Sequence, residues 1–146
     1  MSVFCEPRDF ADVFEQHQIW QQAEWLVVGK GPSFDEFEPK ELQKYSLFTL
    51  NDVVREFEKV DVAHFIDYEA FRRVIDEVYR ADFVVMPFFP HINTVPSKMS
   101  IVELAKDDSA LTKLVREGRL LVYDLGSSSQ RHCRMRISAK FFSAEA

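Results

Sequence analysis

The sequence has few cysteines and no long hydrophobic run. Cys5 and Cys133 are the two cysteines among 146 residues, too few for a disulfide framework and typical of a reducing compartment. No apolar run approaches the length of a membrane-spanning helix. The N-terminus carries charge where a signal peptide would be apolar. The sequence therefore predicts a cytoplasmic protein without a membrane span.

The chain also lacks an excess of positive charge. Its formal net charge is −6, which argues against generic binding of nucleic acid over the whole surface. Hydrophobic residues make up 47% and aromatic residues 14% of the chain, enough for a folded core. No internal repeat or low-complexity linker interrupts it. At this length we expect a single domain over residues 1–146.

A short apolar run followed by two glycines is the most informative stretch. Residues 25–34 read Trp-Leu-Val-Val-Gly-Lys-Gly-Pro-Ser-Phe, and the run 26–28 is typical of a buried strand. Gly29 and Gly31 allow positive φ and let a ligand come close, because they lack a Cβ. A strand that ends in such a turn presents N–H groups at the carboxyl edge, where open α/β sheets bind ligands. The stretch predicts a site for an anionic group such as a nucleotide phosphate.

Two better-known glycine motifs are missing. The dinucleotide fingerprint needs a third glycine where this chain has Phe34, and the ATPase-type loop needs its lysine after the last glycine, whereas Lys30 lies between the two. A plain strand-to-helix turn stays open as an alternative. Ser33 and Glu36 have the spacing of a capping box, which by itself would explain the serine.

Helices and strands are expected to alternate along the chain. The patterns predict helices at 9–22, 39–44, 52–58, 68–81, 100–106 and 109–117, and strands at 25–29, 47–50, 60–66, 83–86, 120–125 and 134–137, with a loop at 87–99. Such alternation predicts an α/β, Rossmann-like fold with a mainly parallel sheet, helices on both faces and right-handed crossovers. Ser143 begins a helix pattern that the sequence does not complete, so we expect a chain truncated at its C-terminus.

Polar residues follow several of the predicted strands. They are Ser33, Asn51, Asp67 and Ser127. The carboxyl ends of parallel strands share one edge, so these side chains could line one cleft, where Asn51 would offer both a donor and an acceptor. The alternative is that Asn51 caps the helix at 52–58 and Asp67 caps the helix at 68–81.

The histidines and the arginines carry weaker signals. His64 lies inside an apolar strand and is expected to be a core histidine, whereas His91, in a proline-rich loop, is expected to be the freest of the four. The basic cluster comprises Arg131, His132, Arg134 and Arg136. It would either meet an anionic donor or acceptor or guard an exposed strand edge with charge.

Three of these features together resemble a known group of enzymes. They are the sequence Gly-Lys-Gly-Pro-Ser-Phe at 29–34, the strand that ends at Asn51, and the helix that begins at Ser143. They resemble bacterial sialyltransferases and the related flagellin-type glycosyltransferases, which carry a Gly-x-Gly-Pro-Ser-hydrophobic loop after the first strand. The resemblance implies a donor-binding domain for a CMP-linked nucleotide sugar, with a glycan acceptor and no metal or other cofactor. The candidate donor-binding residues are Gly29, Lys30, Gly31, Pro32, Ser33, Asn51, Asp67 and Ser143.

The chain departs from that pattern in two places. Lys30 stands where the sialyltransferases have asparagine, although a lysine can still pair with phosphate as a point charge. The histidine base of those enzymes lies in a C-terminal half, and no histidine of this chain matches its motif. The catalytic residues are thus unknown, and this chain alone is expected not to transfer sugar. Exposed apolar surface at a cut end would favour a homo-oligomer. The alternative is a non-catalytic domain that binds a nucleotide or a protein.

Overall fold

The computed structural model describes residues 6–124. Several features predicted from the sequence lie outside this range. They are the strand at 134–137, the basic cluster, Ser127 and Ser143. Within residues 6–124, none of the helices combines the length and the hydropathy that a membrane crossing requires.

The centre of the molecule is a six-stranded parallel sheet, as the alternation of elements predicted. Its strands are β1 (Arg8–Asp9), β2 (Trp25–Val28), β3 (Ser46–Leu50), β4 (Val60–His64), β5 (Ala81–Pro87) and β8 (Leu120–Tyr123). They are ordered β1-β8-β5-β4-β3-β2, and every neighbouring pair is parallel. The described chain is therefore an α/β protein of Rossmann-like character.

Short helices connect the strands. The α-helices are α1 (Phe10–Gln16), α2 (Gln18–Gln22), α3 (Pro39–Leu42), α4 (Tyr68–Arg73), α5 (Ile101–Asp107) and α6 (Ser109–Arg116). The 3₁₀ helices are η1 (Pro32–Glu36), η2 (Asn51–Glu56) and η3 (Val78–Arg80). A small antiparallel hairpin, β6 (His91–Ile92) with β7 (Val95–Pro96), precedes α5.

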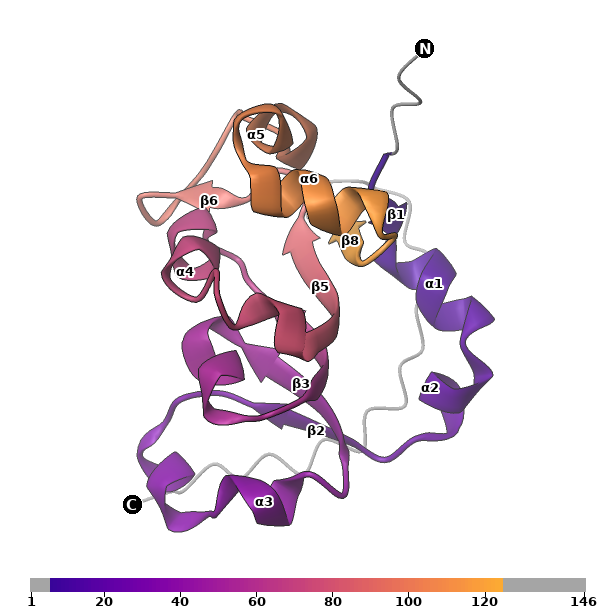
Figure 1. The fold of residues 1–146 in the computed structure, drawn as a ribbon, viewed down its shortest axis with the longest axis vertical. Coiled ribbons are helices and arrows are strands. Elements are labelled where there is room, and N and C mark those ends of the chain that lie inside the picture. Colours follow the sequence, from indigo (N-terminus) through magenta and orange to yellow (C-terminus); the bar gives the residue numbers. More distant parts are fainter. Residues whose placement is uncertain (1–5, 125–146) are drawn as a thin grey trace.

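The strand order explains why helices cover both faces. From β2 to β8 the chain steps from each strand to its neighbour in one direction, and from β1 to β2 it crosses the whole sheet in the opposite direction. Right-handed crossovers that travel in opposite directions place their helices on opposite faces. Figure 1 shows α4 on one side of the sheet and α1 and α2 on the other.

Two hydrophobic clusters fill the space between the helices and the sheet. On the face covered by α4, α5 and α6, Val84 and Leu120 pack with Phe71 and Leu111. On the opposite face, which we call the back face, Val13, Phe14 and Trp20 pack against Trp25, Val62, Val85 and Leu121. Neighbours such as Val84 and Val85 thus point into different clusters, which is why the central strands are apolar at almost every position.

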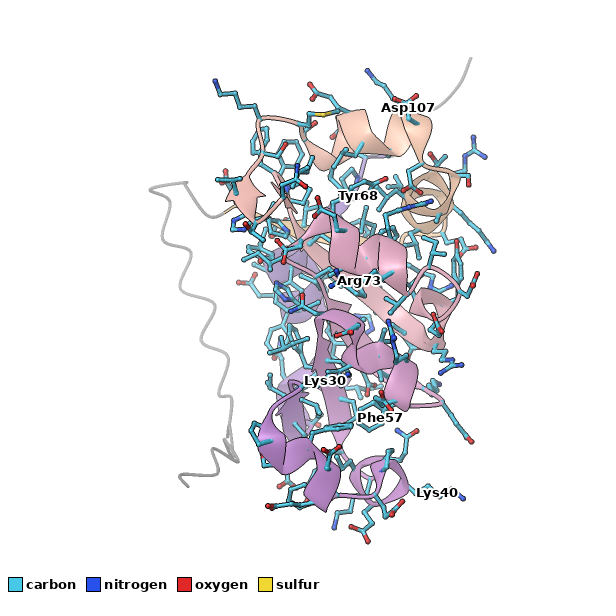
Figure 2. All side chains as sticks on the ribbon, turned by 90° about the vertical axis from the view of Figure 1, so that its left-hand side faces the viewer. Lys30, Lys40, Phe57, Tyr68, Arg73 and Asp107 are labelled. Carbon is cyan, nitrogen blue, oxygen red and sulfur yellow. The ribbon has the colours of Figure 1, made fainter. Side chains whose placement is uncertain are left out.

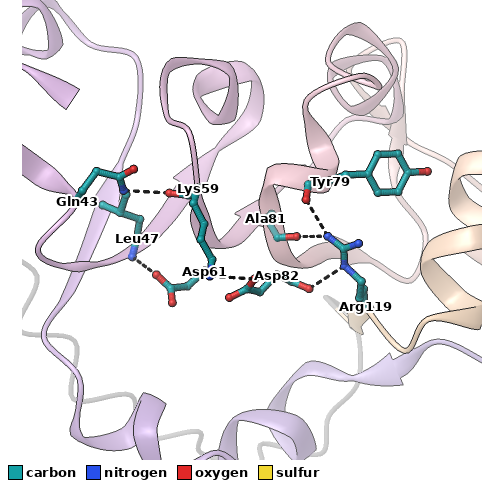
Figure 3. A network of polar contacts seen from close by, with 8 residues as sticks. All are labelled: Gln43, Leu47, Lys59, Asp61, Tyr79, Ala81, Asp82 and Arg119. Atoms are coloured by element: carbon teal, nitrogen blue, oxygen red, sulfur yellow. Dashed lines mark hydrogen bonds and ion pairs between the residues drawn. The ribbon is translucent and has the colours of Figure 1, made fainter. Parts of the chain in front are cut away.

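A polar network holds the amino edge of the sheet (Figure 3). The Arg119 guanidinium donates to the carbonyl oxygens of Tyr79, Ala81 and Asp82. At the start of the neighbouring strands, an Asp61 carboxylate oxygen accepts from the Leu47 N–H at 2.8 Å, and Lys59 Nζ lies 3.9 Å from Asp82 Oδ1. These contacts bind strand ends to one another, so polar side chains at this edge serve the fold.

Two of the predicted helices are interrupted in the structure. The helix expected at 9–22 breaks at His17, whose φ and ψ are −93° and 90°. The helix expected at 68–81 leaves helical geometry at Val74, with φ −117° and ψ 30°, where two β-branched residues with stiff side chains, Val74 and Ile75, follow one another. By contrast, the capping box of Ser100 and Glu103 and the Asp108 cap are present as predicted.

Candidate functional site

A pocket lies under residues 29–33, which we call the glycine loop. The loop follows β2, the outermost strand of the sheet on that side among residues 6–124. The cavity, here called the loop pocket, has a volume of about 330 Å³, within the range of small-molecule sites. It is lined by Leu26, Val27, Val28, Gly29, Lys30, Gly31, Ser33, Phe34, Phe37, Leu42 and Leu50. Four of the eight candidate residues, Gly29, Lys30, Gly31 and Ser33, are therefore brought together.

The interior of the loop pocket is apolar. Leu26 and Val28 come from β2 and Leu42 from α3, and all three are buried. Phe34 and Phe37 from the η1 segment complete the wall, and both pack against the core. The Phe34 ring meets Phe57 edge-on, at 6.4 Å between ring centroids and 76° between planes, a favourable aromatic geometry. This wall is therefore held by the core behind it.

The rim of the loop pocket is basic. Lys30 is exposed and makes no ion pair with any residue in the described range 6–124. The lining includes no aspartate, glutamate, histidine or cysteine. Figure 2 labels Lys30 and Phe57 toward the same end of the molecule as Lys40, away from Tyr68 and Asp107. A positive charge thus stands at the entrance of an apolar pocket.

The two loop glycines do not adopt a left-handed backbone conformation. Gly29 and Gly31 do not use the positive φ that glycine allows, because among the described glycines only Gly118 has it. Gly31 is extended, with φ −112° and ψ 174°, and a Cβ built there would meet nothing within 4 Å. At Gly29 a Cβ would lie 3.4 Å from Leu50 Cδ1. Gly31 therefore has open space beside it, whereas a side chain at Gly29 would contact Leu50.

The serine of the loop does not cap a helix. The N-cap of η1 is Gly31, and no side-chain cap bond is formed there, so the capping-box interpretation of Ser33 and Glu36 is wrong. Pro32 occupies the first helical position, where its fixed φ is suited to a helix start and its missing N–H costs nothing. Ser33 lines the loop pocket instead.

Asn51 lies at the carboxyl end of β3 in a left-handed conformation. Its φ is 54°, which asparagine tolerates better than most residues. Asn51 is the first residue of η2, and the N-cap of η2 is Leu50. The interpretation of Asn51 as a helix cap is therefore wrong. Asn51 Oδ1 is buried without a hydrogen-bond partner among the described residues. A buried acceptor without a donor is costly, and Asn51 therefore has capacity for a ligand, although it does not line the loop pocket.

Asp67 points to a different neighbour. It is the N-cap residue of α4 but forms no side-chain cap bond, and one of its carboxylate oxygens lies 3.8 Å from His91 Nδ1. His91 N also donates to the Ile66 carbonyl oxygen at 2.8 Å. The His91 imidazole, expected to be the freest of the four, thus lies beside a carboxylate, and His132, one of the four, lies outside the described residues. Asp67 is not among the residues that line the loop pocket.

A histidine–tyrosine pair on the back face was not predicted. His64 Nε2 lies 2.7 Å from Tyr123 Oη, and the His64 ring stacks between Phe48 and Tyr123. Burial lowers the pKa of His64 to about 4 and raises the pKa of Tyr123 to about 12, so both are neutral at pH 7. In the sheet register His64 pairs with Leu50, which lines the loop pocket. The two partners are 59 residues apart, and no local pattern connects them.

The fold and this site define an α/β protein with a ligand-sized pocket at the carboxyl edge of a parallel sheet. Within residues 6–124, no group of three or more histidine, cysteine, aspartate and glutamate residues is placed to hold a metal ion. No protein-family model, curated protein or solved structure matches the chain.

Proposed function

We propose that this chain is a glycosyltransferase-like domain and that the loop pocket binds the nucleotide of a CMP-linked sugar donor. The observation that supports the proposal most is the loop pocket itself. It combines an apolar interior, a basic rim at Lys30 and open space above Gly31. A nucleotide has the matching parts, a flat ring with apolar faces and a phosphate that a lysine can pair with.

Each loop residue then has a distinct role. Lys30 neutralises the donor phosphate, and Gly31 leaves room for it to approach the backbone. Pro32 fixes the chain direction, and Ser33 lies at the pocket wall. Asn51, whose Oδ1 lacks a donor among the described residues, would contact the nucleotide from the end of the neighbouring strand.

Nucleotide binding without transfer is the second candidate. Transfer of a sugar needs a group that takes the proton of the acceptor hydroxyl. None of the residues that line the loop pocket carries a carboxylate or an imidazole. This observation favours a binding domain, with the proton acceptor supplied from elsewhere if transfer takes place.

Titration calorimetry with CMP and CDP tests the proposal, with AMP as the comparison nucleotide. Wild type should bind the cytidine nucleotides in preference to AMP. Gly31→Val should weaken this binding by about tenfold or more, which corresponds to a loss of about 1.4 kcal/mol, because the added side chain fills the space above the loop. The fold should be kept, since Gly31 is extended and a Cβ there meets no atom within 4 Å.

Gly31→Ala is the graded control. Its smaller side chain should weaken binding less than valine does, and thermal unfolding of both variants should match wild type. Absent binding by wild type, or equal binding by wild type and Gly31→Val, contradicts the proposal.

A further inference from the structure

We propose that the ligand enters the loop pocket ring first, so that an aromatic ring fills the apolar interior and a phosphate group stays outside on Lys30. The identity of that ring as a nucleobase rests on the proposed function. The direction of entry rests on the distribution of polar groups in the pocket. It therefore applies to any aromatic ring that carries a phosphate.

The interior can accept a ring but not a phosphate. The side chains of Leu26, Val28, Leu42, Phe34 and Phe37 surround it, and none of them can donate a hydrogen bond. A buried phosphate would lose its hydration without gaining partners, which is costly for a charged group. A flat ring gains contact area with aliphatic groups and edge or stacking contacts with the two phenylalanines.

The rim can accept a phosphate but offers little to a ring. Lys30 is the one charged residue of the lining, and it lies between Gly29 and Gly31, of which Gly31 has open space beside it. The chain carries a net charge of −6, so much of its surface repels an anion. Lys30 is free of ion pairs with residues 6–124, and its charge is thus available to a ligand.

Calorimetry with four small probes tests the direction of entry. The probes are cytidine, CMP, ribose 5-phosphate and phenyl phosphate. If the ring supplies most of the affinity, cytidine should bind within about tenfold of CMP, the contribution of one charge-assisted contact. Ribose 5-phosphate should not bind measurably. Phenyl phosphate should bind, because it carries both a ring and a phosphate.

Two lysine variants separate the rim from general charge. Lys30→Ala should weaken the binding of CMP and of phenyl phosphate by about tenfold and leave the affinity for cytidine unchanged. Lys59→Ala removes the same charge at the amino edge, where Lys59 lies near Asp82, and should change none of the four affinities. Raising the salt concentration should mimic Lys30→Ala for CMP and leave cytidine unaffected.

One variant tests the interior. Val28 lines the pocket on the same face of β2 as Leu26, so Val28→Thr replaces a methyl group by a hydroxyl in the interior, and thermal unfolding of the variant checks that the fold is kept. Because the new hydroxyl has to be desolvated when a ring binds, the affinities for cytidine and for CMP should fall by the same factor, about tenfold. A Val28→Thr effect on CMP alone would contradict the ring-first arrangement.

The probes distinguish failure of this inference from failure of the proposed function. If ribose 5-phosphate binds as well as CMP, or Lys30→Ala weakens cytidine as much as CMP, the direction of entry is wrong while nucleotide binding stands. If phenyl phosphate binds in a Lys30-dependent way but no cytidine compound binds, ring-first entry stands and the nucleotide proposal fails. Absence of binding by every ring compound overturns both.

Discussion

At the scale of single residues, His64 shows how burial sets the charge of a side chain. Its ring lies between Phe48 and Tyr123, and its Nε2 atom is occupied by the Tyr123 hydroxyl. Because the buried ring cannot be hydrated when it is charged, the pKa of His64 falls from 6.5 to about 4. His64 therefore stays neutral through the physiological range, in contrast to an exposed histidine.

The lowered pKa predicts a loss of stability in mild acid. The unfolded chain takes up the His64 proton near pH 6.5, whereas the folded chain does so only near pH 4. Neutral His64 thus contributes fully to the free energy of unfolding above pH 6.5. This contribution declines as the pH falls and is lost below pH 4. The decline should amount to up to about 3 kcal/mol. Urea unfolding measured at several values between pH 7.5 and pH 4 checks this.

His64→Gln is the matched variant, because it keeps a polar side chain but does not titrate. The difference in unfolding free energy between wild type and His64→Gln removes the contribution of the carboxylates that titrate in both. That difference should shrink as the pH falls. A difference that is constant from pH 7.5 to pH 4 would show that burial does not control His64.

At the scale of elements, one carboxylate joins α4 to α6. Asp108 Oδ1 accepts from the N–H groups of Ala110 and Leu111 at the start of α6. Asp108 Oδ2 accepts from the Tyr68 hydroxyl at 2.5 Å and lies 3.1 Å from Arg72 Nη1. The Asp108 side chain is only 1% exposed. Burial, followed by the bond to Asp108, raises the pKa of Tyr68 to about 12.

Asp108→Ala should therefore cost more than the loss of a helix cap. A cap alone is worth about 1 kcal/mol, but this substitution also leaves Tyr68 and Arg72 without their buried partner. We expect a loss of about 3 kcal/mol in unfolding free energy. Ser100→Ala removes a cap from α5 without such partners and should cost about 1 kcal/mol. Equal costs for the two variants in urea unfolding would show that the link between α4 and α6 contributes nothing.

The elements that the sequence predicted well are those with local signals. Three consecutive apolar residues mark β2, and Ser100 with Glu103 marks the start of α5. β1 was not predicted because its two residues, Arg8 and Asp9, are charged and exposed. It is a strand only through its pairing with β8, and nothing near it in sequence indicates that pairing.

The candidate site divides in the same way. The glycine loop and its apolar floor are contiguous in sequence, so their proximity could be predicted. The backbone conformation of the glycines could not be predicted, because φ depends on how the turn is packed, and both residues lack positive φ. The His64–Tyr123 pair required knowledge that β8 lies two strands from β4, and a single sequence does not contain the strand order in a directly visible form.

At the scale of the whole molecule, we predict that the 146-residue chain does not transfer sugar by itself. The loop pocket has no carboxylate or imidazole in its lining, and proton transfer alone is worth about 10²–10⁴-fold in rate. Release of CMP from CMP-sialic acid should stay at the background rate with a panel of galactosides. Turnover that disappears in Asn51→Ala would contradict this and would make His64 and His91 the next residues to substitute.

The pairing of β1 with β8 has a consequence for synthesis on the ribosome. β1 is among the first segments of the described chain to be made, yet its partner β8 is the last of the described strands. At ordinary rates of translation β1 waits on the order of 10 s for that partner. Meanwhile β2 to β5 can pair in the order in which they emerge. Strands therefore add in the order β2 to β5, and β5 is an unpaired edge until β8 is made. β1 is the last strand to pair, as the edge strand beside β8.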